Sequence, residues 1–65
     1  MNYKPIKAVL LRNNDRIIDT DGVFIVTDIE FDFREDIVTY TTTDVSGKRS
    51  ARWSAMNRIV NKVTG

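Results

Sequence analysis

The most regular pattern in the chain is the alternation of apolar and polar side chains between residues 23 and 34. Residues 23–26 are all apolar, and after Thr27 residues 28–34 alternate strictly between polar and apolar side chains. A period of two, rich in β-branched and aromatic residues, is typical of a strand with one face in water. Because only the first part is apolar on both faces, we predict one long strand that bends or bulges near Thr27.

Shorter segments on both sides of this strand also have the composition of strands. Residues 37–43 are all β-branched or aromatic, which favours a strand over a helix. Residues 6–11 form a short apolar strand, and residues 16–18 form a brief extended piece. The polar clusters at 12–15 and 19–22 are rich in Asn, Asp or Gly, which favour turns. The pattern therefore predicts strands separated by tight turns.

The segment Asp-Val-Ser-Gly at residues 44–47 predicts the turn of a hairpin. Gly47 supplies the positive φ that a type I turn followed by a bulge requires. This turn geometry would pair Asp44 with Lys48, and hence Tyr40 with Arg52. The strand that follows the turn therefore begins directly after Gly47 and returns alongside residues 37–43.

The register of this hairpin decides which face of the sheet carries the tryptophan. The turn geometry pairs Thr39 with Trp53. The hydrophobic pattern favours the neighbouring register, in which Tyr40 faces Ala51 and Val38 faces Trp53. A shift by one residue moves every side chain to the other face of the sheet. Both registers therefore stay open at this point.

Residues 54–63 fit two different structures. Ser54 can cap a short helix with an apolar stripe along one side. Alternatively, residues 54–58 form a single tight turn and residues 59–63 form a closing strand. Ten residues make a marginal helix, and three of them are β-branched. We therefore favour the turn followed by a strand and keep a short C-terminal helix as the alternative.

The composition excludes several classes of function. The chain has 65 residues, 42% hydrophobic and 29% charged, which fits one small folded domain over residues 1–65 and excludes intrinsic disorder. It contains no Cys and no His, so we expect no disulfide, no thiolate nucleophile, no Cys/His zinc site and no imidazole base. No apolar run approaches the roughly 20 residues that span a bilayer. We expect a cytoplasmic protein with no cofactor, no small-molecule substrate and no catalytic activity.

Two groups of acidic residues do not have the pattern of a metal or catalytic site. If Gly22 held the glycine position of a calcium loop, Ile17 would stand at position one, where a carboxylate is needed. Asp28, Glu30 and Asp32 share one face of the long strand, but acid–base catalysis needs a cleft that separates their pKa values. A stripe of this kind is far more often a solubilising face.

Charge is divided unevenly along the chain, although the net charge is only +1. Residues 15–36 carry eight acids and two arginines, whereas residues 45–65 carry five cations and no acid. Such asymmetry indicates a basic binding face, or two blocks that neutralise one another on adjacent strands. An acidic block would also repel a nucleic acid lying over it, so only one side of the domain is compatible with phosphates.

The order of strands and turns resembles that of SH3-like small barrels. The segments NDRI, DGVFIVTDIEFD, DIVTYTTTDVSGK and MNRIVNKV are similar to the strand–turn arrangement of KOW and Tudor-type modules. The segment VTYTTTDVSGKRSARWSA is similar to the central hairpin of the archaeal seven-kilodalton chromatin proteins, which bind DNA. The resemblance implies an all-β fold, a small five-stranded SH3-like barrel, and a nucleic-acid partner.

The candidate interface combines the cations of the second half of the chain with its one tryptophan. Its residues are Lys48, Arg49, Arg52, Trp53, Arg58 and Lys62. Cations supply affinity for phosphates, and an aromatic ring offers a platform on which a base stacks. A lone tryptophan in so small a domain is usually a core residue. Arg49 and Arg52 could likewise pair with the acidic stripe of the long strand, so these alternatives stay open.

We therefore predict a non-catalytic nucleic-acid-binding module that uses the basic hairpin and the segment after it. The alternative is a protein-interaction module, such as a small adaptor or inhibitor. Modules of this kind bind by strand addition at an exposed edge or in an aromatic groove. A viral or phage origin fits the sequence as well as a cellular one, and the sequence leaves the oligomeric state open.

Overall fold

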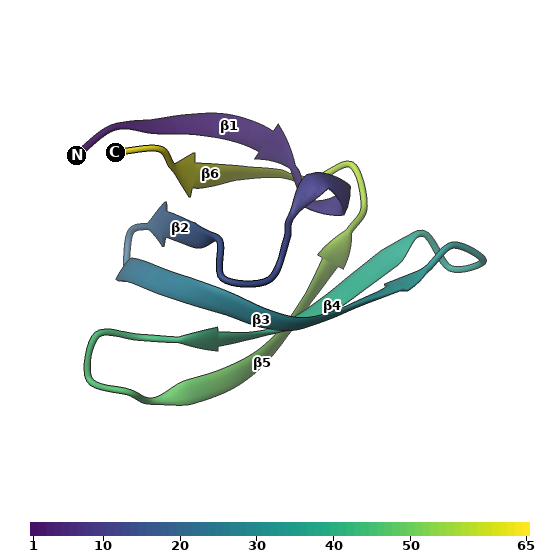
Figure 1. Ribbon diagram of the computed structural model, residues 1–65. Helices are drawn as coiled ribbons and strands as arrows, with labels where there is room; N and C mark the ends of the chain where they lie inside the picture. The colour runs from purple at the N-terminus through teal and green to yellow at the C-terminus, as the bar shows by residue number, and fades with distance from the viewer.

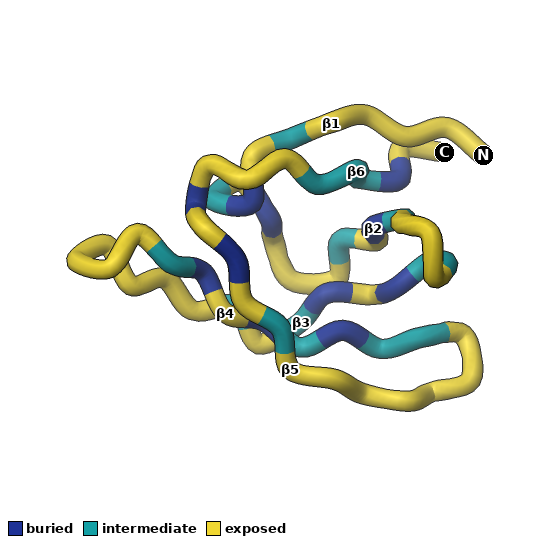
Figure 2. Tube along the Cα trace, turned by 180° about the vertical axis from the view of Figure 1, so that it is seen from behind, coloured by how far each residue is buried: buried dark blue, intermediate teal, exposed yellow.

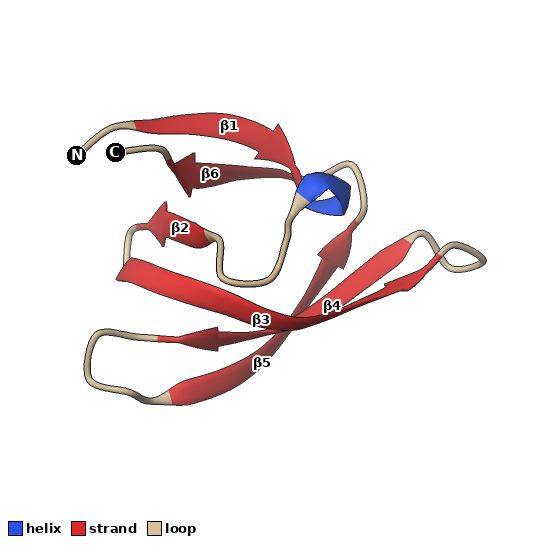
Figure 3. Cartoon of the chain, viewed as in Figure 1, coloured by secondary structure: helices blue, strands red, loops and turns tan.

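The computed structural model describes all 65 residues as one antiparallel sheet with almost no helix (Figure 1 and Figure 3). The strand order is β1-β6-β2-β3-β4-β5. The elements are β1 (Tyr3–Lys7), the 3-10 helix η1 (Ala8–Leu10), β2 (Arg16–Asp19), β3 (Gly22–Asp32), β4 (Ile37–Thr43), β5 (Arg49–Ala55) and β6 (Ile59–Val63). The all-β, barrel-like fold is thus confirmed, with six strands in an open sheet where five were predicted.

The sheet bends over itself, with β1, β6 and β2 in one layer and β3, β4 and β5 in the other (Figure 1). The first and last strands pair directly, with Tyr3 opposite Val63. At the other edge of the sheet, β5 pairs only with β4. The barrel is therefore open along β5.

The long strand β3 contains the predicted irregularity. Its pairing with β4 shifts between Thr27 and Glu30, so two residues of β3 lie opposite Tyr40 alone. Asp28 takes a φ of 54° at this bulge. Aspartate adopts this left-handed conformation more readily than most residues, because its short polar side chain bonds locally. The bulge separates the half of β3 that is buried from the half that is exposed.

The core lies between the two layers of the folded sheet (Figure 2). Its seven buried hydrophobic residues are Ala8, Leu11, Ile17, Phe24, Val26, Val38 and Tyr40. Ile6, Ile29 and Val60 pack against this cluster and are only partly buried. Inner positions of β4 alternate with exposed or half-buried outer ones, as a period of two requires.

The N-terminal strand differs from the prediction. Strand β1 ends at Lys7 and the chain then makes a 3-10 turn, whereas a strand over residues 6–11 was expected. The amide of Ala8 donates to the carbonyl of Arg58 at 2.8 Å, and the amide of Val9 donates to that of Met56 at 2.9 Å. These bonds hold the segment against the β5–β6 turn, so its backbone cannot continue along the sheet.

The β4–β5 hairpin has the register that its turn dictates. The Asp44 amide donates to the Lys48 carbonyl at 3.0 Å, and the Gly47 amide donates to the Asp44 carbonyl at 3.0 Å. Gly47 has a φ of 89°. Tyr40 therefore faces Arg52. The alternative register with Tyr40 opposite Ala51, which the hydrophobic pattern favoured, is wrong because the turn bonds fix the pairing.

The C-terminal segment is a turn followed by a strand, so the alternative of a short C-terminal helix is wrong. The Arg58 amide donates to the Ala55 carbonyl at 3.1 Å, and β6 then pairs with β1 on one side and β2 on the other. A strand at this position satisfies backbone groups of two neighbours, which a helix would leave unpaired. The only helix, η1, is too short to cross a membrane.

Candidate nucleic-acid interface

Trp53 lies on the outer face of the sheet and is 71% exposed. The usual core position of a lone tryptophan is therefore wrong here. The reason is the hairpin register, which places Trp53 opposite Thr39 and puts Tyr40 into the core instead. Across β4, Thr39 is in turn opposite Glu30 of β3. The indole thus stands at the edge of the sheet, and its cross-strand neighbours, Thr39 and then Glu30, are polar.

A cleft of about 410 Å³ opens between β5 and the strands β2 and β6. Trp53 lines it together with Arg52 of the same strand, and Arg58 and Ile59 line it from the side of β6. Ile59 is 57% exposed, so this apolar side chain of the cleft lining meets solvent. The cleft therefore holds two cationic side chains, those of Arg52 and Arg58, and the exposed Ile59. The indole of Trp53 alternates with Arg52 along β5 and stands on the outer face of this edge strand.

Arg52 is held in place on the inner side of this cleft. Its guanidinium donates to the Asp19 carboxylate at 3.1 Å. It also lies over the Phe24 ring, 4.5 Å from the centroid, in a cation–π arrangement. The other carboxylate oxygen of Asp19 accepts the Asp21 amide at 2.7 Å. Arg52 is thus positioned by two contacts, and Asp19 offsets part of its charge.

Two of the predicted cations are engaged in ion pairs away from the cleft. Arg49 pairs with Asp28 at 3.0 Å, and both side chains are well exposed, so the pair contributes about 0–1 kcal/mol. Lys62 pairs with Asp15 at 3.4 Å. Asp15 also accepts the Arg12 amide at 2.9 Å and its side chain is only 14% exposed. Lys62 therefore acts mainly to hold the segment before β2.

The structure brings together some of the predicted residues and separates others. Arg52, Trp53 and Arg58 share the cleft, whereas Lys48, Arg49 and Lys62 do not line it. Lys48 and Arg58 make no ion pair. Arg58 is therefore the one cleft cation whose full charge is available to a ligand.

Sequence reasoning missed most of the residues that line the cleft, among them Ile59 and Asp19. Ile59 was interpreted as part of a closing strand, and Asp19 only as part of a turn. The alternation of polar and apolar residues does not indicate that either residue lies near β5. Their distance from β5 depends on how the two layers of the sheet pack against each other. Of the two arginines that could pair with the acidic stripe of the long strand, Arg49 does so, with Asp28, whereas Arg52 pairs with the turn residue Asp19.

The hairpin that carries β5 is stabilised by the Asp44 carboxylate. The hydroxyl of Ser46 donates to it at 2.6 Å, and the amides of Ser46 and Lys48 donate to it at 2.9 Å. These hydrogen bonds stabilise the ionised carboxylate and hold the pKa of Asp44 below its usual value. The bond from the Ser46 hydroxyl has the largest effect on this pKa. The turn thus fixes the pairing of β5 with β4, and with it the position of Trp53.

The arrangement offers contacts that suit a binding site. A ring can stack on a planar group, and guanidinium groups can donate to phosphate or carboxylate oxygens. No group of three or more acidic residues is close enough to hold a metal ion. No family model matches the chain, and no curated protein matches its sequence.

Proposed function

We propose that the chain is a non-catalytic module that binds single-stranded nucleic acid in the cleft beside β5. The observation that carries this proposal is the 71% exposed Trp53 on the edge strand β5, which also forms one side of the cleft that holds Arg52 and Arg58. An indole at the surface can stack on an unpaired base, and the two guanidinium groups can contact the phosphates next to it. A base inside a duplex is already stacked, so the single strand is the better ligand.

The charges around Trp53 support one path for the strand. Glu30 lies two strand spacings from Trp53, roughly 10 Å away, and its carboxylate repels phosphates. On the other side of Trp53 stand Arg58 and the β6 segment. The proposed strand therefore follows the open edge between β5 and β6, and does not cross the sheet toward β3.

The number of cations sets the expected affinity. Two phosphate contacts on a single strand give a slope of log K against log salt of about −1.4, since each contributes about −0.7. One stacked base adds about 1–3 kcal/mol. We therefore expect weak binding that is detectable at low salt and is lost as the salt concentration rises.

The test is fluorescence anisotropy of a labelled single-stranded DNA or RNA oligonucleotide, titrated with the protein at several salt concentrations. Arg58→Gln should weaken binding and reduce the salt slope by about 0.7. Trp53→Ala should weaken it by about 5- to 150-fold, which corresponds to one stacked base. Arg34→Gln is the matched control, because it removes the same charge at the tip of the β3–β4 hairpin.

A second control uses the acidic residue in the bulge. Asp28→Asn keeps a residue that tolerates the left-handed conformation, removes one negative charge and frees Arg49. It should leave affinity unchanged or improve it, whereas Arg49→Gln should reduce it slightly. Arg52→Gln should also reduce affinity, although it removes the contacts with Asp19 and Phe24 as well. Absence of salt-dependent binding to any single strand would refute the proposal.

The open edge of β5 favours a second candidate function, the binding of an extended peptide. The Asp44 amide donates to the Lys48 carbonyl, so every second residue of β5 counted from Lys48 directs its backbone N–H and C=O groups toward β4. The backbone groups of the residues between them, Arg49, Ala51 and Trp53, point away from β4 toward the open edge. A peptide strand could pair with these groups. Such a partner would slow hydrogen exchange at the Ala51 and Trp53 amides, whereas a nucleic acid would mainly shift the indole signals.

A further inference from the structure

The tip of the β3–β4 hairpin, residues 30–37, carries two exposed phenylalanines outside the core. Phe33 is 75% exposed and Phe31 is 40% exposed. Their rings are stacked, with centroids 5.9 Å apart and an interplanar angle of 29°. Full burial of one such side chain would contribute about 1.5–3 kcal/mol. A domain of this size has a low free energy of unfolding, and burial of these rings would raise it. Two adjacent exposed rings are therefore more typical of a binding surface than of an ordinary exposed turn.

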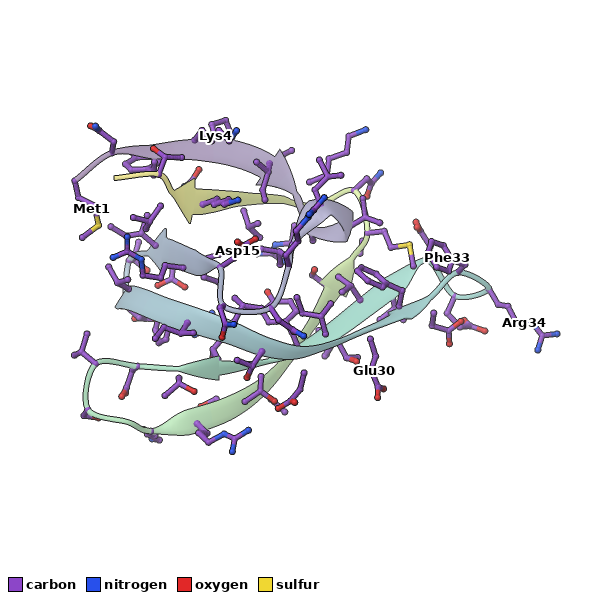
Figure 4. All side chains as sticks on the ribbon, viewed as in Figure 1. Met1, Lys4, Asp15, Glu30, Phe33 and Arg34 are labelled. Carbon is purple, nitrogen blue, oxygen red and sulfur yellow. The ribbon has the colours of Figure 1, made fainter.

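The rings stand beside a hollow of about 600 Å³. Ile37 also lines it, together with four polar or charged residues, Glu30, Asp32, Arg34 and Thr39. The surface therefore combines apolar side chains with carboxylates. Figure 4 shows the Arg34 side chain pointing away from the tip, and Glu30 on the opposite side of the hairpin from Phe33. The rings are therefore accessible from solvent.

The backbone that presents the rings is held by hydrogen bonds. One Asp32 carboxylate oxygen accepts the amides of Arg34 and Glu35 at 3.1 and 3.2 Å. On the returning side, the Met56 amide donates to the Asp36 carbonyl at 3.1 Å. The turn is thus tied both within itself and to the β5–β6 turn. A partner that binds there would not have to order the loop first.

The hairpin tip carries four carboxylates and one cation in addition to the aromatic pair. The carboxylates belong to Glu30, Asp32, Glu35 and Asp36, and the cation to Arg34. None of the five makes an ion pair. Aromatic faces and free carboxylates both attract the head groups of arginine and lysine, and the rings also pack against the methylene stems. The charge of the tip therefore complements a basic segment and repels phosphates.

We propose that the hairpin tip is a docking surface for a basic segment of a partner protein. An arginine or lysine stem packs on Phe33 and Phe31, and its head group meets the carboxylate of Glu35 in the turn that follows. This surface is separate from the cleft that holds Trp53, Arg52 and Arg58. The domain can thus hold a basic protein segment at one site while the cleft stays open to its own ligand.

The experiment measures binding of a short labelled peptide of alternating arginine and serine by fluorescence anisotropy. A peptide with glutamine in place of arginine is the control ligand. Phe33→Ser should weaken binding of the arginine peptide by about five-fold, and Glu35→Gln by about two-fold. Val45→Ser is the matched control, since Val45 is also an apolar residue at a hairpin tip and is 94% exposed. Both variants should keep the wild-type amide NMR spectrum outside their own hairpin.

Two outcomes overturn the proposal. If Phe33→Ser binds as tightly as Val45→Ser and wild type, the attraction is only general electrostatics. If the chain alone self-associates, and Phe33→Ser abolishes this in sedimentation experiments, the occupant is a second copy of the chain. Trp53→Ala separates this proposal from the nucleic-acid one. It should weaken nucleic-acid binding by the factor given above and leave the affinity for the arginine peptide unchanged.

Discussion

Tyr40 lies directly opposite Arg52 across the β4–β5 pair, with Tyr40 buried in the core and Arg52 over the Phe24 ring. Because side chains alternate along a strand, the next residue, Trp53, must face outward. One pairing thus determines both the aromatic residue of the core and the one available to a ligand. It also explains why a single tryptophan in a small domain need not stabilise it.

The first prediction concerns these two aromatic residues. Trp53→Ala should change the free energy of unfolding by about 1 kcal/mol or less, the size of a cross-strand contact with Thr39. Tyr40→Ala should cost about 3–5 kcal/mol, because it leaves a cavity in the core. Urea denaturation measures both. Tryptophan fluorescence in the native state should be red-shifted and readily quenched by acrylamide, and a blue-shifted emission would contradict the exposed position.

The second prediction concerns the hairpin turn. Gly47→Ala should destabilise the domain by about 1–2 kcal/mol, because Gly47 has a φ of 89°. An added Cβ would meet nothing within 4 Å, so the cost comes from the backbone conformation alone. Gly47→Asn should cost less, since Asn tolerates this region. Gly65→Ala is the control, and equal effects at the two glycines would show that the turn is not as described.

The third prediction concerns acid stability. The pKa of Asp44 is lowered from 3.8 by its bonds to Ser46 and Lys48, so folding favours its ionised form. The stabilisation is present above pH 3.8 and is lost as the pH falls through the lower pKa of the folded state. Asp44→Asn should therefore weaken the pH dependence of the urea midpoint below about pH 4. An unchanged pH dependence would mean that this carboxylate does not hold the turn.

The fourth prediction concerns the buried Thr42 of β4, which is 1% exposed. Its hydroxyl donates to the Ser50 carbonyl over 3.4 Å, which is long for such a bond. Thr42→Val keeps the shape, and the weak bond that it removes should change stability by less than about 1 kcal/mol. Thr42→Ser keeps the hydroxyl and loses a buried methyl, so it should cost about 1 kcal/mol or more. The reverse order would show that the hydroxyl matters more than the packing.

The turns and the long strands could be predicted from the sequence because their causes are local. The turn at Gly47 depends on the backbone conformation of that residue and not on distant parts of the chain. The change in the hydrophobic pattern near Thr27 indicated the bulge. The hydrophobic pattern failed for the hairpin register because it treated Trp53 as a core residue. Arg52 took the inner position instead, since its stem and guanidinium pack on Phe24 and its charge meets Asp19.

The end of β1 and the composition of the cleft could not be predicted from the sequence. The 3-10 turn at Ala8 exists because carbonyls from residues 56 and 58 reach its backbone, and those residues are far away in the sequence. The cations of the candidate interface were identified from composition. Which of these cations form ion pairs depends on which carboxylates lie near them in the folded sheet, as the ion pair of Lys62 with Asp15 shows.

The pairing of β1 with β6 has a consequence for how the chain folds. The contact between Tyr3 and Val63 closes a loop that spans nearly the whole sequence, and the Thr64 amide adds a bond to the Asn2 carbonyl at 2.8 Å. Loops of this length form late, because their closure entropy must be overcome before any contact compensates for it. During synthesis, the β3–β4–β5 meander can assemble first, while β1 waits until β6 has left the ribosome. Strand β1, which is made before the other strands of this sheet, is therefore among the last to pair.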